Sequence, residues 1–352
     1  NCGGHTFDIS GTGAFTSTTN TFTIDNEVNI TGGSFSANGG TIVVDGPTAT
    51  FNVNNSITLN IFTIAKNTGA TMNVGASDIL TVNGTLTLTD GTSNTGSIDS
   101  QSTVNMTSTW DGGTTALLVT GSNNSVVTLN SGNGAFPITL NNINANVNLA
   151  GAGTVAFSTA SFQQGTLTAG STTSTYSGAV TLSGATFNAP TSGGGTTSFN
   201  SSFNQSSGTF NGGTNVMNHS GTFTLSGGTY NATSNNTNLS NSFTHTAGGT
   251  FNHSNGQVTA NLNAGVTWDF TGSETFNNFT LSALSNWTLT IPALDTLIVA
   301  NTLTLTNGAL STGTVEARGN VSVGINFDAG GTANLKFQNS TVDQSLDFTT
   351  YT

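Results

Sequence analysis

The most constraining feature of this chain is a close 20-residue repeat between positions 201 and 260. Phe203, Phe223 and Phe243 stand one repeat apart, and a Gly-Thr-aromatic-Asn element recurs with nearly the same period. A fixed period of this length is typical of solenoids, in which each unit buries its apolar face only against its neighbours. The repeat therefore predicts a stacked architecture rather than a globular one.

The stacked units are expected to be β-strands. Leu and Thr alternate with period two in TLTLT at 85–89 and at 302–306, and in WTLTI at 287–291. Alternation of this kind places Leu on one face of a strand and Thr on the other. No window keeps the apolar spacing of an amphipathic helix, and the abundant Gly, Asn and Thr are poor helix formers. The chain is predicted to be all-β.

Weaker copies of the repeat extend this prediction along the chain. ATFNV at 49–53 returns as ATMNV at 70–74, and VTLSGATFN at 180–188 resembles FTLSGGTYN at 223–231. Right-handed crossovers are the default between parallel strands. We therefore predict one continuous right-handed parallel β-helix over residues 1–352, with roughly 20–23 residues per rung. The best-defined repeats are expected at 180–260.

Composition excludes several classes of protein. Thr, Ser, Asn and Gly make up 200 of the 352 residues, but only 5% are charged, unlike most disordered chains. The net charge is −12 with three scattered cations, which cannot supply the basic patch that nucleic-acid binding needs. No apolar run is long enough to span a bilayer. Between Gly112 and Trp268 there is no charged side chain, so close lateral neighbours would be tolerated there.

The N-terminal residues suggest secretion. The chain begins with Asn1 instead of Met, and we expect that a leader has been removed. Cys2 is the only cysteine, which rules out an internal disulfide framework. Whether Cys2 is a free thiol or forms an intermolecular bridge stays open.

Several segments resemble the β-strand repeats of large bacterial surface proteins and adhesins. They are TLTLTNGALSTGTVEARGNVSVG, GGTFNHSNGQV and TGSETFNNFTLS, and the resemblance covers most of the chain from about residue 150. It implies an extracellular or cell-surface β-solenoid and indicates no particular ligand.

No pattern in the sequence predicts catalysis, a cofactor or a metal site, so we expect a protein that is not an enzyme. His219, His245 and His253 lack the convergent Cys or Asp partners of a zinc site. Asp25 and Asp45, 20 residues apart, could become neighbours on successive rungs. They leave open a carbohydrate-active enzyme, since β-helical hydrolases use clustered carboxylates. Outward Thr ladders also occur in ice-binding solenoids, but Thr-x-Thr recurs irregularly here.

The two ends of the chain suggest self-assembly. Neither NCGGHTFDISG nor SLDFTTYT resembles the polar cap that usually closes a solenoid. Uncapped ends of opposite polarity would join head to tail and propagate. We expect a subunit of an extracellular filament, with itself as partner and Cys2, Phe7, Phe15, Phe348 and Tyr351 as candidate interface residues. The alternative is the stalk or ligand-binding module of an adhesin, with cell-surface or extracellular glycans as partners.

Overall fold

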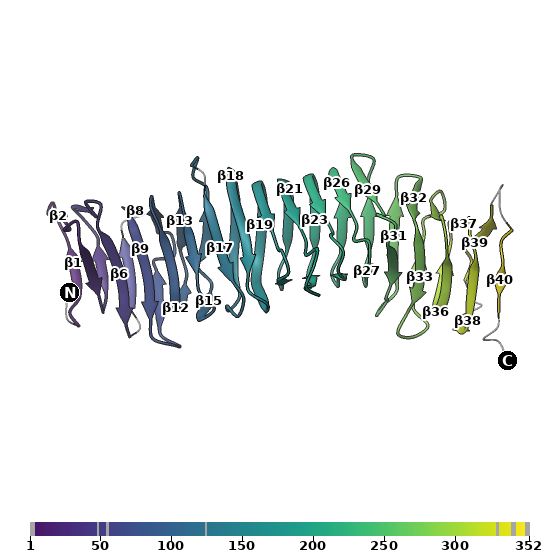
Figure 1. The fold of residues 1–352 in the computed structure, drawn as a ribbon, viewed down its shortest axis with the longest axis horizontal. Helices are drawn as coiled ribbons and strands as arrows, with labels where there is room; N and C mark the ends of the chain where they lie inside the picture. Colours follow the sequence, from purple (N-terminus) through teal and green to yellow (C-terminus); the bar gives the residue numbers. More distant parts are fainter. Residues whose placement is uncertain are drawn as a thin grey trace. The chain divides into compact units, whose positions relative to one another are not determined.

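The computed structural model describes residues 4–47, 49–53, 56–123, 125–328, 331–338 and 343–348. The chain divides into two compact units, residues 1–177 and 178–352. Figure 1 shows that each unit consists of strands lying side by side. The described residues form 40 strands and no helix, which confirms the all-β prediction. One continuous solenoid over both units stays a prediction.

The first unit contains the strands β1 to β20. Their bounds are β1 Phe7–Ile9, β2 Ala14–Thr16, β3 Thr21–Ile24, β4 Val28–Ile30, β5 Ser34–Ser36, β6 Thr41–Gly46, β7 Ala49–Val53, β8 Ser56–Leu59, β9 Ile61–Lys66, β10 Thr71–Val74, β11 Ile79–Val82, β12 Leu86–Asn94, β13 Ser97–Ser100, β14 Val104–Met106, β15 Trp110–Gly113, β16 Ala116–Val119, β17 Val126–Asn130, β18 Phe136–Ala150, β19 Thr154–Thr168 and β20 Thr173–Tyr176.

The second unit contains the strands β21 to β40. Their bounds are β21 Val180–Asn188, β22 Thr197–Phe199, β23 Phe203–Asn211, β24 Met217–His219, β25 Phe223–Leu225, β26 Gly228–Asn231, β27 Asn236–Leu239, β28 Phe243–His245, β29 Gly249–Asn252, β30 Gln257–Ala260, β31 Val266–Phe270, β32 Ser273–Phe276, β33 Asn278–Ser282, β34 Thr288–Thr290, β35 Thr296–Val299, β36 Leu303–Ser311, β37 Thr314–Ala317, β38 Val321–Phe327, β39 Asn334–Phe337 and β40 Leu346–Asp347.

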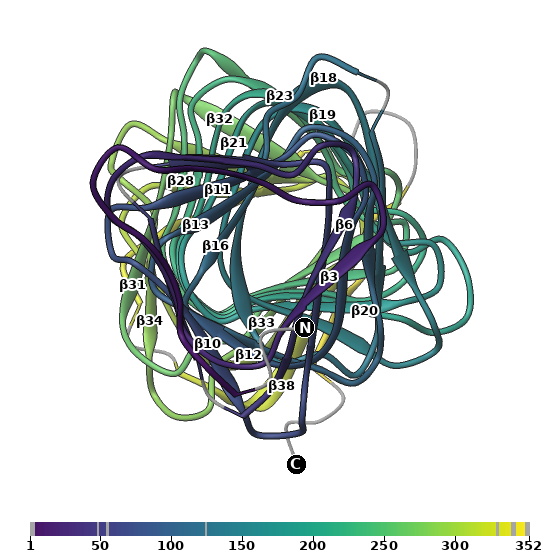
Figure 2. The same cartoon turned by 90° about the vertical axis from the view of Figure 1, so that its left-hand side faces the viewer.

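In both units the strands pair in parallel with strands of the neighbouring turns. In the first unit β3 pairs with β6, and β11, β13 and β16 form a second wall (Figure 2). In the second unit the repeated phenylalanines pair in register, Phe203 with Phe223 and Phe223 with Phe243. These parallel stacks make the fold a β-solenoid of about 16 turns, as the repeat predicts.

Turn length varies more than the predicted 20–23 residues. Leu86 pairs with Val104, 18 positions later, whereas Val321 pairs with Leu346, 25 positions later. The register of neighbouring strands is set by their inward side chains, so the corners absorb the insertions and deletions.

At one place the strand register differs by two residues from the alignment of similar segments. The match between ATFNV and ATMNV aligns Phe51 with Met72, but the structure pairs Met72 with Ala49 and Val74 with Phe51. Since side chains alternate with period two, a shift of two residues leaves every inward side chain inward. Sequence similarity therefore identified the correct faces but the wrong partners.

The core is a narrow column of inward side chains. The Leu side chains of both TLTLT segments are buried, as predicted. In the second unit the Phe210 and Tyr230 rings stack with centroids 4.7 Å apart and planes 6° apart. Asn side chains form a ladder on the outer face of these strands. Asn211 Nδ2 donates to Asn188 Oδ1, and Asn231 Nδ2 donates to Asn211 Oδ1, each at 2.8 Å. Such ladders hold polar faces in register.

Candidate functional site

The first turn of unit 1 exposes an aromatic end of the core column. Phe7, Phe15 and Phe22 come from β1, β2 and β3, one from each strand of that turn. The Phe7 ring lies 4.9 Å from Phe15 and 5.4 Å from Phe22, measured between centroids. Phe35 of β5 stacks on Phe15 at 5.7 Å. All four rings are partly exposed, and we call them the aromatic cluster.

The last described turn of unit 2 carries an exposed apolar groove with a volume of about 500 Å³. Its walls are β39 and β40 with the residue after β40, and its floor comes from β36 and β38. The lining residues, which we call the terminal groove, are Leu305, Val323, Phe327, Leu335, Phe337, Leu346 and Phe348.

The groove is an uncovered section of the core column. β39 pairs with β37, so Leu335 and Phe337 continue the column above the buried Val315 and Ala317. Leu335 is 40% exposed and Phe337 is 44% exposed, although they occupy inward positions. Among the described residues no further strand lies on β39, which explains the exposure.

The predicted interface residues fall on these two surfaces where they are described. Phe7 and Phe15 belong to the aromatic cluster, and Phe348 lines the terminal groove. Cys2 and Tyr351 lie outside the described residues. Sequence reasoning missed the other members of both surfaces, although the alternation in NLKF at 334–337 marks Leu335 and Phe337 as inward.

An ion cluster holds β39 at the rim of the groove. The Glu316 carboxylate accepts from Arg318 Nε at 2.7 Å and from Lys336 Nζ at 2.9 Å, and it is itself buried. Hydrogen bonding to Lys336, more than the burial that opposes it, lowers the pKa of Glu316. Gln344 Nε2 donates to the carbonyls of Ala317 and Gly319, both at 2.9 Å. These bonds fasten both groove walls to the turn below.

Glu316→Gln is expected to loosen β39 because it removes the charge that both cations share. Since the Arg318 and Lys336 side chains are about half exposed, the free energy of locally opening β39 should fall by about 1 kcal/mol. Amide exchange in β39 should then be roughly fivefold to tenfold faster. Wild-type protein should show the same loss as the pH falls below the ordinary Glu value, because the lowered pKa makes the carboxylate stabilising only when ionised. Hydrogen exchange measured by mass spectrometry checks the effect of the variant and the effect of pH. Glu27→Gln in unit 1 is the control and should leave the amide exchange of β39 unchanged.

Asp25 and Asp45 are the candidate acids of the enzyme alternative; Asp25 directly follows β3, and Asp45 lies near the end of β6. Ile24 pairs with Val44, so the two Asp residues come next on adjacent turns. Lys66, on the following turn, is buried, and its Nζ donates to the Asp45 carbonyl at 2.8 Å. Burial lowers the pKa of Lys66, opposed by the charges of Asp45 and Asp25. The charges of the two Asp residues thus offset part of the cost of burying the Lys66 amine.

Two of the three histidines in the repeat region, His219 and His245, are hydrogen-bonded to other side chains. His219 is buried between the rings of Phe199 and Phe223, at centroid distances of 4.9 and 4.7 Å, and its Nε2 lies 2.8 Å from the Tyr230 hydroxyl. His245 Nδ1 is hydrogen-bonded to the Glu274 carboxylate, and this bond raises the pKa of His245. No sequence pattern indicates the pair of His245 and Glu274, because its members are 29 positions apart.

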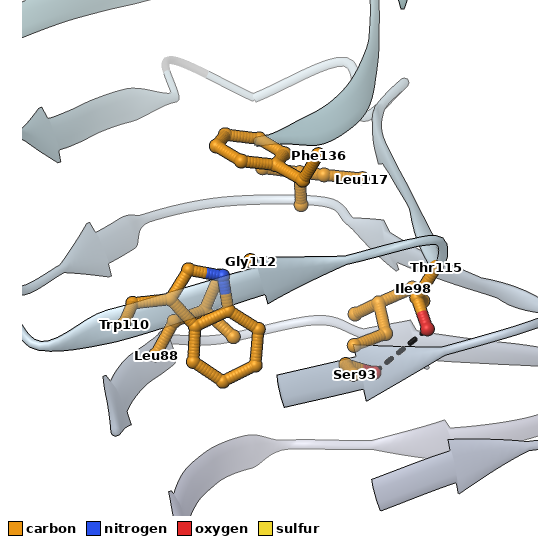
Figure 3. Close-up of a pocket in the computed structure, with 8 residues that line it drawn as sticks. All are labelled: Leu88, Ser93, Ile98, Trp110, Gly112, Thr115, Leu117 and Phe136. Atoms are coloured by element: carbon orange, nitrogen blue, oxygen red, sulfur yellow. Dashed lines mark hydrogen bonds between the residues drawn. The ribbon is translucent and has the colours of Figure 1, made fainter. Parts of the chain in front are cut away.

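A small cavity lies inside unit 1 (Figure 3). It is lined mainly by apolar side chains, including Trp110 and Phe136, and has a volume of about 20 Å³. Ser93 and Thr115 form a hydrogen bond of 2.7 Å on its wall. The space suits about one water molecule, so it is no candidate for a substrate site.

The described residues contain no group of three or more His, Cys, Asp or Glu side chains placed to hold a metal ion. They also include no helix with the length and hydropathy that a bilayer crossing requires. Comparison with known protein families, curated proteins and solved structures finds no match to this chain.

Proposed function

We propose that this protein is an extracellular structural subunit that polymerises head to tail. The observation that carries the proposal is the terminal groove, where inward core positions of the last described turn stand open. The small number of charged side chains agrees with a structural rather than a catalytic role.

The energetic argument rests on the apolar side chains of the groove. Leu335, Phe337, Leu346 and Phe348 are each close to half exposed. Full burial of one such side chain is worth about 1.5–3 kcal/mol, so covering the remaining halves would contribute several kcal/mol. An exposed apolar edge strand such as β39 also offers unpaired backbone groups to another strand. Both contributions favour an added parallel layer.

A second copy of the chain is the occupant that we propose. If the copy binds with a different surface from the one it leaves free, the contact is heterologous and each added subunit exposes a new groove. Growth then continues into a filament instead of stopping at a dimer.

Charging the groove is expected to abolish polymerisation. In the double variant Leu335→Glu with Phe337→Glu, two carboxylates would have to be buried at the contact, which is strongly unfavourable. Wild-type protein should form filaments under negative-stain electron microscopy and sediment as a broad fast species, whereas the double variant should sediment as a monomer. Leu294→Glu, at a residue of the same unit that is 93% exposed and outside the groove, should polymerise like wild type. Wild-type protein that stays monomeric at high concentration contradicts the proposal.

A further inference from the structure

We infer that an opening between β5 and β8 of unit 1 binds a neutral, multiply hydroxylated ligand of the size of one sugar ring. The opening, which we call the side pocket, has a volume of about 320 Å³ and is lined by Ile30, residues 32–35 and residues 56–58. It belongs to unit 1, whereas the terminal groove belongs to unit 2. The inference is therefore independent of the proposed polymerisation.

The side pocket exists because one wall of the solenoid is not closed between two successive turns. β4 pairs with β7 and β6 pairs with β9, so the two turns lie one strand spacing apart on two walls. On the third wall β5 pairs with β2 and β8 pairs with β11. Among the described residues β5 and β8 do not pair with each other. The pocket is therefore an interruption of the ladder within unit 1.

The corner before β5 explains the interruption. Thr31 N donates to the Ile9 carbonyl at 3.1 Å, and Ser34 N donates to the Gly13 carbonyl at 2.9 Å, so the corner is bonded to the preceding turn. Gly33 has a φ of 64°, and a Cβ at this position would overlap the Gly13 oxygen. Glycine tolerates both the positive φ and the close approach. These contacts tie β5 to β2 instead of β8.

Both sides of the side pocket present backbone groups without a strand partner. Ser34 N donates to the preceding turn, and residues of a parallel strand bond alternately to its two neighbours, so the N–H and C=O of Phe35 face β8. On β8 the Leu59 carbonyl accepts from the following turn, so the backbone groups of Ser56 and Thr58 face β5. All three residues line the pocket. Backbone groups in such a place need donors and acceptors from elsewhere.

These groups favour a neutral ligand that carries both donors and acceptors. None of the lining residues is charged, so an ionic ligand would lose its hydration without gaining a counter-charge. A purely apolar ligand would leave the backbone groups without partners. The hydroxyl groups of a sugar both donate and accept, like the hydroxyls of Ser34, Ser56 and Thr58 on the pocket lining.

The apolar lining and the size of the pocket fit a single ring. Ile30 and Ile57 are buried, and the partly exposed Phe35 ring is held by its stack on Phe15. Such side chains pack against the C–H groups of a ligand. A volume of about 320 Å³ lies at the lower end of the range for small-molecule pockets. A peptide strand does not fit between β5 and β8, because it would need two strand spacings of about 4.8 Å where the neighbouring walls leave one.

Binding of sugars to the full-length protein tests the inference. Saturation-transfer NMR titrations use glucose, galactose, mannose and N-acetylglucosamine as neutral probes, and glucuronate and glucosamine as charged counterparts. We expect at least one neutral sugar to bind with a dissociation constant on the order of 1 mM, as its number of atoms allows. The charged counterparts should bind at least about tenfold more weakly, because the pocket lining offers them no counter-charge.

Two variants place the binding in the side pocket. Ser56→Trp should abolish binding because the indole occupies the pocket, and Phe35→Ala should weaken binding at least about tenfold because it removes the ring. Ser97→Trp is the matched control and should bind like wild type. It makes the same substitution two turns after Ser56 on the same wall, since Ser56 pairs with Ile79 and Ile79 with Ser97. Circular dichroism shows whether each variant keeps its fold.

Three results would overturn the inference. The first is folded wild-type protein that binds none of the four neutral sugars. The second is binding that Ser56→Trp leaves unchanged, because the ligand would then lie elsewhere. The third is tighter binding of an end-blocked extended tripeptide than of any sugar, lost in Ser56→Trp, which would make the opening a site of strand addition. Polymerisation is read separately by sedimentation, so each of these results leaves the proposed function untouched.

Discussion

Replacing Phe223 by alanine is expected to lower the free energy of unfolding of unit 2 by about 3–5 kcal/mol. Phe223 is 1% exposed and lies at the centre of the aromatic column. Its ring is 4.7 Å from Phe243, Tyr230 and His219, measured between centroids. Alanine would leave a cavity that these stacked rings cannot close, because strand pairing above and below holds each of them in place.

The outward neighbour of Phe223 is the matched control. Thr224 lies on the same strand and faces outward, so Thr224→Ala should change the free energy of unfolding by no more than about 0.5 kcal/mol. Urea denaturation followed by circular dichroism measures both. Because a solenoid is held together by contacts between neighbouring turns, Phe223→Ala should also increase amide exchange first in β25 and its partners β23 and β28. Equal losses in the two variants would contradict the assignment of the column as the core.

Acidification from pH 6.5 to pH 5 is expected to destabilise unit 2 by about 1.5 kcal/mol through His219 alone. Burial lowers the pKa of His219 to about 3, against 6.5 for the unperturbed group. Between these values the unfolded state binds a proton that the folded state refuses, so stability falls as the pH falls. The slope is about 1.4 kcal/mol per pH unit while this difference lasts.

The variant His219→Phe should remove this dependence. Phe preserves the stack between Phe199 and Phe223, and the Tyr230 hydroxyl keeps its contact with Met217 Sδ at 2.8 Å. Free energies of unfolding measured between pH 6.5 and 5 should therefore be flat in the variant and sloped in the wild type. Matching slopes would show that the titrating group lies elsewhere.

His245 acts in a different pH range. Its pKa is raised by Glu274, so its stabilisation is complete below pH 6.5 and is lost as the pH rises through the raised value. It adds no slope between pH 6.5 and 5. Protonation of Glu316, whose pKa is lowered, contributes only at still lower pH. The chosen interval therefore isolates His219.

Sequence patterns predicted interior positions well and exact partners less well. Val104 pairs with Val127, and Val127 pairs with Val147, at separations of 23 and 20 residues that lie within the predicted range. Alternation identifies the inward residues of a strand without reference to any other strand. The partner of each strand depends on corner length, and the two-residue shift between Met72 and Phe51 shows that similarity alone does not report it.

The candidate site was harder to predict than the fold. Phe7, Phe15 and Phe348 were identified as apolar residues near the ends, but the groove depends on which inward positions remain uncovered. Leu335 and Phe337 have the same alternation as the buried Leu297 and Val299, which lie two turns earlier in the same stack of strands. A local pattern carries no information about whether another layer lies above it.

The sequence by itself determined that this protein is a stack of parallel β-strands around an apolar column, because a 20-residue period and a two-residue alternation leave no other way to bury its apolar side chains. Only the tertiary structure decided which turns pair, which histidine is enclosed and which meets Glu274, and where the column stands open. The physical reason is that the direction of a side chain, inward or outward, is a local property of its strand. Whether that side chain is covered, and which residue it contacts, depends on residues one or more turns away.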